Sequence, residues 1–97
     1  MEAEKQKLKY IKDELTYHRY DYYNTMTFRL ILVEICSYLG RCANAYLHQQ
    51  TRSVLKGEFR KISDMYDRIK NADRPEMESY RKHVISSLDT VLQTLES

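Results

Sequence analysis

Apolar side chains recur every three or four residues along almost the whole chain, which is the spacing of one face of an α-helix. The residue types that interrupt helices are scarce, since the 97 residues include two Gly and one Pro. The spacing predicts helices over residues 3–23, 26–49, 53–71 and 75–95. Short connections between helices favour antiparallel neighbours. We therefore expect one all-α domain, a small antiparallel helical bundle of about four helices.

The sequence marks the expected breaks between these helices with different clarity. Residues 73–76 combine a capping Asp, a Pro in the first turn and an acid three residues after the cap. The break before residue 53 rests on a half-turn shift of the apolar stripe, and Thr51 or Ser53 is the expected N-cap. Residues 22–25 are weak helix formers but include no breaker, so one continuous helix through the first two segments remains an alternative.

The first predicted helix carries two apolar or aromatic stripes instead of one. The first stripe joins aliphatic residues to a histidine and a tyrosine: Leu8, Ile11, Leu15, His18 and Tyr22. Tyr10, Tyr17 and Tyr20 lie roughly opposite, interrupted by Asp13. A surface helix needs one apolar stripe and one polar face. The second stripe therefore predicts that another copy of the chain, a partner protein or a flat ligand covers it.

The tyrosine stripe and its neighbours are the main candidate binding residues. Tyr and Arg are favoured interface anchors, and they also stack on nucleobases, while Lys and Arg hold phosphates. We expect self-association through the first helix. The predicted anchors for a protein are Tyr10, Tyr17, Arg19 and Tyr20. For a nucleotide-like ligand the same tyrosines would stack, and Lys9, Lys12 or Arg19 would hold phosphate. Packing of these tyrosines inside the bundle remains an alternative.

The second predicted helix has a polar face opposite its main apolar stripe. Ser37, Arg41, Asn44 and His48 are spaced four, three and four residues apart, so they would share that face. Arg41 and His48, with six residues between them, resemble the Arg-x(4–6)-His motif of the HEPN ribonucleases, which are small helical proteins that pair two motifs by dimerising. The resemblance covers one helix, and Cys42 stands where the family usually has a polar residue. It implies a metal-independent ribonuclease with His48 as general acid or base and Arg41 stabilising the transition state; an ordinary solvated face is the alternative.

Three further patterns predict which side chains are buried or exposed. Leu30 and Val33 lie opposite the main stripe of the second helix, so its first half is apolar nearly all round and is expected to be central and buried. His18, in the aliphatic stripe of the first helix, is expected to be a partly buried structural histidine. Charges of alternating sign predict an exposed, ion-paired face on the third helix, at Arg60, Lys61, Asp64, Asp67 and Arg68.

Composition and motif content argue against several functional classes. The charge is nearly balanced, with 16 Lys and Arg against 14 Asp and Glu, so non-specific DNA binding is not expected. The longest aliphatic run, residues 30–33, is far shorter than the ~20 residues of a membrane span. The first ten residues do not resemble a signal peptide. Cys36 and Cys42 would point to different sides of one helix, so we expect reduced thiols and a cytoplasmic location.

The sequence therefore predicts a binding protein more strongly than an enzyme. No phosphate-binding loop, nucleophile elbow, metal-ligand spacing or cofactor motif is present in the sequence. We expect a non-enzymatic cytoplasmic helical protein, homo-oligomeric through its first helix. It would act as an inhibitor or adaptor that occupies a protein partner, or would sequester a small nucleotide-like ligand, as small phage- or plasmid-encoded proteins do. The alternative is the ribonuclease that Arg41 and His48 imply.

Overall fold

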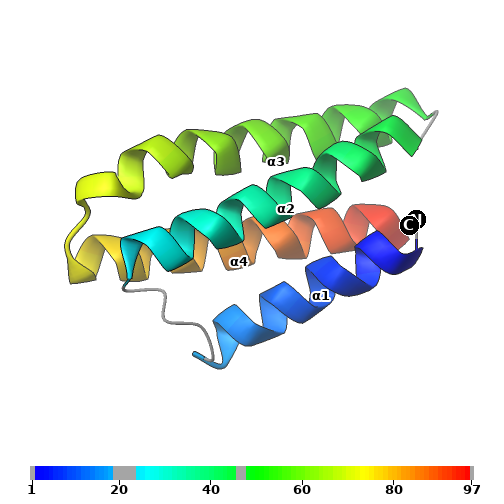
Figure 1. Ribbon diagram of the computed structural model, residues 1–97. Helices are drawn as coiled ribbons and strands as arrows, with labels where there is room; N and C mark the ends of the chain where they lie inside the picture. Colours follow the sequence, from blue (N-terminus) through cyan, green and yellow to red (C-terminus); the bar gives the residue numbers. More distant parts are fainter. Residues whose placement is uncertain (1, 19–23, 46–47, 97) are drawn as a thin grey trace.

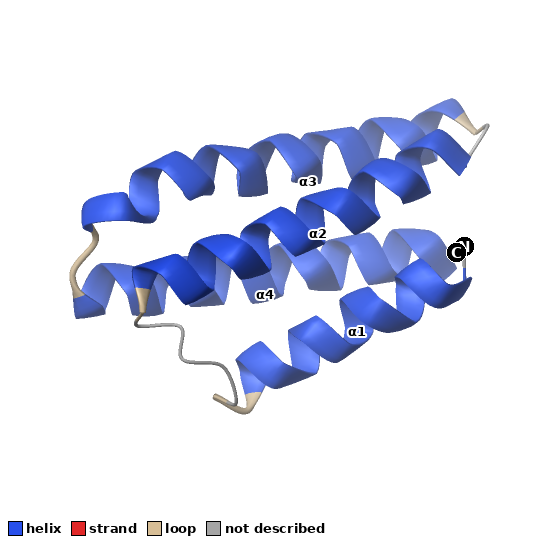
Figure 2. Cartoon of the chain, viewed as in Figure 1, coloured by secondary structure: helices blue, strands red, loops and turns tan. Residues whose placement is uncertain are grey.

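The chain folds as an antiparallel bundle of helices. The structure, a computed structural model, describes residues 2–18, 24–45 and 48–96. Its elements in chain order are α1 (Glu2–Thr16), α2 (Thr25–Ala45), α3 (Gln49–Arg68), the short 3-10 helix η1 (Ile69–Asn71) and α4 (Arg74–Glu96). Both α1 and α3 pack against α2 and α4, in alternating directions (Figure 1). The described residues contain no strand (Figure 2), so the predicted all-α bundle is confirmed.

One apolar core runs along the axis of the bundle and draws side chains from every helix. Its fully covered members include Leu8, Ile11 and Leu15 of α1, Phe28, Leu32, Ile35 and Leu39 of α2, Leu55 and Ile62 of α3, and Val84, Leu88 and Val91 of α4. Burying one such side chain stabilises the folded state by about 1.5–3 kcal/mol. The core therefore uses the main apolar stripe that the sequence shows on each helix.

Side-chain caps define where α2 and α4 begin. At α4 the amide of Glu76 donates to Asp73 Oδ1 at 2.9 Å, and the amide of Asp73 donates to Glu76 Oε1 at 3.4 Å. This reciprocal pair is the predicted capping box. At α2 the amide of Thr27 donates to Asn24 Oδ1 at 3.0 Å. Asn24 is thus the N-cap of α2, a role for which Asn is among the best residues.

The turn between α2 and α3 lies earlier than the sequence predicts. The second helix was expected to reach residue 49, but α2 ends at Ala45 and α3 begins at Gln49. The predicted N-caps Thr51 and Ser53 are wrong, because His48 holds that position and its Nδ1 accepts the amide of Thr51 at 3.4 Å. Histidine is not a preferred capping residue, whereas Ser and Thr are. The sequence therefore favoured Thr51 and Ser53 as the caps.

The first helix also ends earlier than predicted, at Thr16 instead of residue 23. His18 has a φ of 57°, in the left-handed region that stops an α-helix, and its amide donates to the Leu15 carbonyl at 3.4 Å. The alternative of one continuous helix through α1 and α2 is therefore wrong. The expected burial of His18 is wrong as well, because its side chain is exposed beyond the end of the helix. Tyr22, expected in the same stripe, lies outside the described residues.

A buried arginine on α4 caps the C-terminal end of α1. Arg81 Nη1 donates to the Leu15 carbonyl at 2.8 Å, across the interface between the two helices. The same guanidinium holds Glu78 through two hydrogen bonds, from Nη2 at 2.6 Å and from Nε at 3.2 Å. A carbonyl in the last turn of a helix has no partner inside the helix, and a cation at that end also favours the helix dipole. Arg81 therefore fixes the place where α1 stops.

The outer side of α2 is apolar and exposed, which corrects the expectation of a helix buried all round. Met26, Leu30 and Val33 expose 74%, 65% and 51% of their surface. They follow one another at intervals of four and three residues and so form one stripe, here called the α2 ridge. The prediction failed because α2 packs against α1 and α3 on its two flanks, and no described element covers its outer side.

Replacing Arg81 by Ala tests its role at the end of α1. The change leaves the Leu15 carbonyl and the Glu78 carboxylate without this donor, so we expect a loss of about 3 kcal/mol in the free energy of unfolding, measured by urea denaturation. Lys82→Ala removes an exposed cation on the next residue and should change stability by less than about 0.5 kcal/mol. Equal effects of the two substitutions would contradict the assignment.

Candidate functional site

The outer side of α1 carries an exposed pair of tyrosines. Tyr10 and Tyr17 expose 58% and 65% of their surface, so neither ring packs inside the bundle. They are seven residues apart and lie on the same side of the chain; this pair is here called the tyrosine ridge. Tyr20 and Arg19, the other predicted anchors, lie outside the described residues. Aromatic rings left in water on a small protein are typical of a surface that another molecule covers.

The predicted phosphate-holding lysines do not gather beside the tyrosine ridge. Lys12 Nζ lies 2.9 Å from Asp89 Oδ1 and ties the flank of α1 to α4. Lys9 is exposed and makes no ion pair with another described residue. Of the two predicted lysines in α1, Lys12 is thus engaged in an ion pair with α4 and Lys9 is not.

Arg41 and His48 do not share the helix face that the sequence suggested. Arg41 is exposed on α2, with its guanidinium carbon 5.8 Å from the ring centre of Tyr38. His48 lies beyond the end of α2 and caps α3, with its Nδ1 3.3 Å from the Thr51 hydroxyl. The resemblance to the HEPN motif rested on one helix carrying both residues. The observed geometry gives that interpretation no support.

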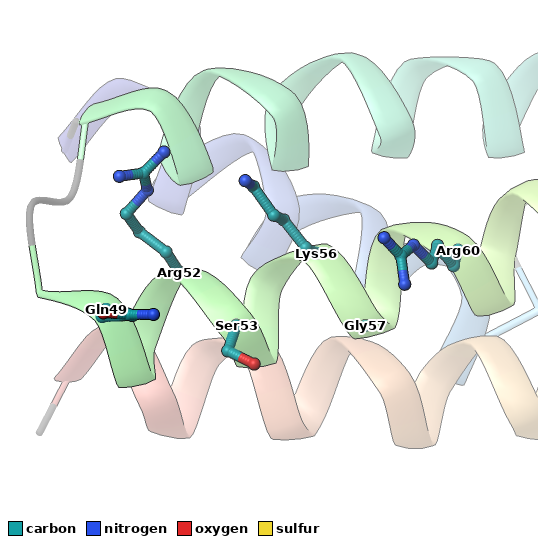
Figure 3. Close-up of a pocket in the computed structure, with 6 residues that line it drawn as sticks. All are labelled: Gln49, Arg52, Ser53, Lys56, Gly57 and Arg60. Carbon is teal, nitrogen blue, oxygen red and sulfur yellow. The ribbon is translucent and has the colours of Figure 1, made fainter.

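A basic depression lies on α3, at residues for which the sequence predicted no binding site. Arg52, Lys56 and Arg60 follow at intervals of one helical turn and line an open hollow of about 640 Å³ together with Gln49, Ser53 and Gly57 (Figure 3). None of the three cations makes an ion pair with another described residue. The spacing of these cations around an interior glycine is visible in the sequence and could have identified them. The predicted ion-paired face began only at Arg60, and its Lys61 pairs with Glu58 at 3.0 Å.

A smaller apolar groove lies between α2 and α3. It has a volume of about 220 Å³ and is lined by Leu32, Val33, Cys36, Ser63 and Tyr66. The guanidinium carbon of Arg29 lies 4.1 Å from the centre of the Tyr66 ring and covers it. Phe59, next to the groove, exposes 37% of its surface, and its carbonyl lies 4.0 Å from Cys36 Sγ. The groove therefore offers contact to an apolar side chain.

Comparison with protein-family models, curated proteins and solved structures gives no match. Within the described residues, no group of three or more His, Cys, Asp and Glu side chains is placed to hold a metal ion. No described helix has both the length and the apolar character that crossing a membrane requires. The described surfaces that bear on function are the tyrosine ridge, the α2 ridge, the basic depression and the apolar groove.

The thiol of Cys36 provides a reporter in the apolar groove. Burial raises the pKa of this thiol above its usual range, and burial likewise raises the pKa of Cys42, which is fully covered. The thiolate is the reactive form, so we expect iodoacetamide to modify Cys36 more slowly than free cysteine at neutral pH and faster as the pH rises. Mass spectrometry should find Cys42 unmodified until the protein is unfolded. Modification of Cys36 at the rate of free cysteine would contradict this assignment.

Replacing His48 by Asp tests its role as the cap of α3. A carboxylate at the N-cap accepts amide hydrogens well and favours the positive end of the helix dipole. We expect His48→Asp to raise the free energy of unfolding by about 0.5–1 kcal/mol and His48→Ala to lower it by a similar amount. The measurement is thermal unfolding followed by circular dichroism. Equal stability of the Asp and Ala variants would show that residue 48 does not cap the helix.

Proposed function

We propose that this protein is a non-enzymatic helical binding protein that self-associates through α1 and acts by occupying a protein partner, as an inhibitor or adaptor. The observation that carries the proposal is the exposure of the tyrosine ridge, with 58% of Tyr10 and 65% of Tyr17 open to solvent. Tyrosine buries a large area at an interface while its hydroxyl stays hydrated at the rim, and it is enriched among the residues that dominate binding energy.

The α2 ridge supports the same role. Met26, Leu30 and Val33 are all more than half exposed on the helix next to α1. Small bundles bury a limited share of their surface, and association with another chain covers more of it. Isolated apolar residues are common on protein surfaces, but two exposed apolar ridges on adjacent helices indicate a surface that contacts another molecule. We therefore place the working surface of the protein on its outer helix faces and not in an internal cavity.

A protein partner is favoured over a nucleotide-like ligand at α1. Stacking on Tyr10 or Tyr17 would need cations nearby to hold the phosphates. Lys12 is engaged with Asp89 on the flank toward α4, which leaves Lys9 as the remaining predicted cation in the described part of α1. The tyrosine ridge can bury an apolar surface without such cations.

The solution mass of the protein tests self-association through α1. We expect the wild type to be an oligomer by light scattering on a sizing column. Tyr10→Ser combined with Tyr17→Ser should yield a folded monomer, because both rings that the interface buries are lost. Circular dichroism checks that the helices remain, which we expect because neither ring contributes to the core.

A matched variant on the α2 ridge shows which surface is responsible. Leu30→Ser with Val33→Ser removes a comparable amount of exposed apolar surface from α2 and should leave the oligomer intact. If this variant becomes the monomer while the tyrosine variant keeps the wild-type mass, the interface lies on α2 and the assignment to α1 is wrong. A monomeric wild type would contradict self-association altogether.

A further inference from the structure

The flank of α3 that faces α2 is basic in its N-terminal part and apolar in its C-terminal part. Lys56, Phe59, Ser63 and Tyr66 follow at intervals of three or four residues and so share this flank. Arg52 lies one turn before Lys56, and Figure 3 shows both side chains directed toward the α2 side of the helix. The basic depression and the apolar groove are therefore parts of one surface, here called the α2–α3 face.

The cations of this face lack carboxylate partners within the described chain. Arg52, Lys56 and Arg60 make no ion pair there, and neither do Asp64 and Asp67, the next carboxylates along α3. The Nε atom of Arg52 is buried and has no hydrogen-bond acceptor among the residues that the structure describes. Cations spaced by one turn repel one another, and a buried donor without an acceptor is unfavourable. Carboxylates supplied from outside would relieve the repulsion among the three cations.

The two glycines of the chain lie on different helices near the basic depression, and Figure 3 places Gly57 on the edge of α3 nearer α4, away from the side to which Arg52 and Lys56 point. Gly57 lines the basic depression. On α2, Cys36 contacts Phe59 of α3, and Gly40 lies one turn further along α2 than Cys36. Gly40 is therefore opposite the turn of α3 that holds Lys56. A Cβ atom at either glycine would meet nothing within 4 Å. Glycine inside a helix lowers its stability, and packing within the described chain does not explain its presence. Bare backbone at both positions lets another segment approach closely.

From these observations we infer that the α2–α3 face binds an acidic amphipathic helix of a protein partner. Apolar side chains of that helix contact Val33 and Phe59, which are 51% and 37% exposed, at the groove. Its carboxylates pair with Arg52, Lys56 and Arg60 in the basic depression. An amphipathic helix laid in a groove is a general mode of peptide recognition. The inference rests on the protein-binding role proposed above and does not require self-association through α1.

The same surface fits a nucleic acid less well. A single strand needs exposed aromatic rings on which successive bases can stack, but Arg29 covers the ring of Tyr66, which leaves Phe59 as the one exposed ring among the described residues of this face. The chain has a net charge of only +2, without the basic excess that is typical of nucleic-acid binders. The side chains that line the groove are mainly apolar, which matches aliphatic side chains and not phosphates.

Binding of designed peptides tests the inference. The probe is a fluorescently labelled helical peptide with Leu at one face and Glu on both flanks, followed by fluorescence anisotropy. We compare it with a peptide that has Lys for Glu, one that has Ser for Leu, and a single-stranded RNA. The Glu/Leu peptide should bind at least about tenfold more tightly than either altered peptide or the RNA. Its affinity should fall as salt is added, because the ion pairs at the rim are screened.

Variants locate the binding site. Arg52→Gln with Lys56→Gln should weaken the Glu/Leu peptide by about tenfold or more. The matched control, Lys9→Gln with Lys82→Gln, removes the same charge from exposed positions on α1 and α4 and should leave the affinity within about twofold. Gly57→Leu keeps every charge but fills the hollow, so it should also weaken binding while circular dichroism shows an intact fold. Bound peptide should slow the alkylation of Cys36 severalfold.

Each contrary result overturns the inference. The inference is wrong if the folded wild type does not bind the peptide, or if it binds the RNA more tightly. It is also wrong if the Arg52/Lys56 variant and its control lose affinity equally, or if bound peptide does not slow the alkylation of Cys36. The solution mass of the tyrosine variant is measured separately. A monomeric wild type that binds the acidic peptide through the α2–α3 face would disprove self-association and support this inference. An oligomeric wild type that does not bind the peptide would support self-association and disprove this inference.

Discussion

The buried guanidinium of Arg81 sets the geometry on which the rest of the bundle depends. Its hydrogen bond to the Leu15 carbonyl joins α4 to the last turn of α1, and its contacts with Glu78 keep the charge paired. Because α1 ends there, α2 can run antiparallel to it. Two ion pairs, Lys5 with Glu96 and Lys12 with Asp89, continue the same α1–α4 contact along the bundle. The first and last helices are thus held together by polar contacts along one flank, while apolar packing fills the core.

This arrangement leaves the outer sides of the helices free for binding. Each α-helix packs against two others in the bundle, so an apolar residue opposite the core stays largely exposed. That is the position of Tyr10, Leu30 and Val33. The basic cluster on α3 lies on a different side, where it continues into the groove against α2. The protein therefore presents two surfaces of different chemistry. One is mainly apolar and aromatic, and the other is apolar with cations that have no ion-pair partner among the described residues.

The main apolar stripe of each helix could be predicted from sequence, because it depends only on the residue types and on their spacing along the chain. The capping box at Asp73 and Glu76 was predictable for the same local reason. The end of α1 was not, because a distant arginine and a histidine with positive φ determine it. The exposure of the tyrosines could be expected, but the separation of Lys12 from them could not, since it depends on Asp89 of α4. The basic depression was missed because only Arg60 of its three cations was assigned to a helix face, the expected ion-paired one, while Arg52 and Lys56 were assigned to none.

The composition of α3 works against the stability of its own helix. No acid lies in its first turn, Arg52 places a cation near the positive end of the helix dipole, and Gly57 adds backbone freedom that the folded state must give up. A library selected only for resistance to heat or protease would therefore enrich acids near residues 49–52 and alanine at position 57. These are the substitutions that would remove the positive charge and the bare backbone of the α2–α3 face. Sites at which stability is readily gained would in this way outline the binding surface before any partner is known.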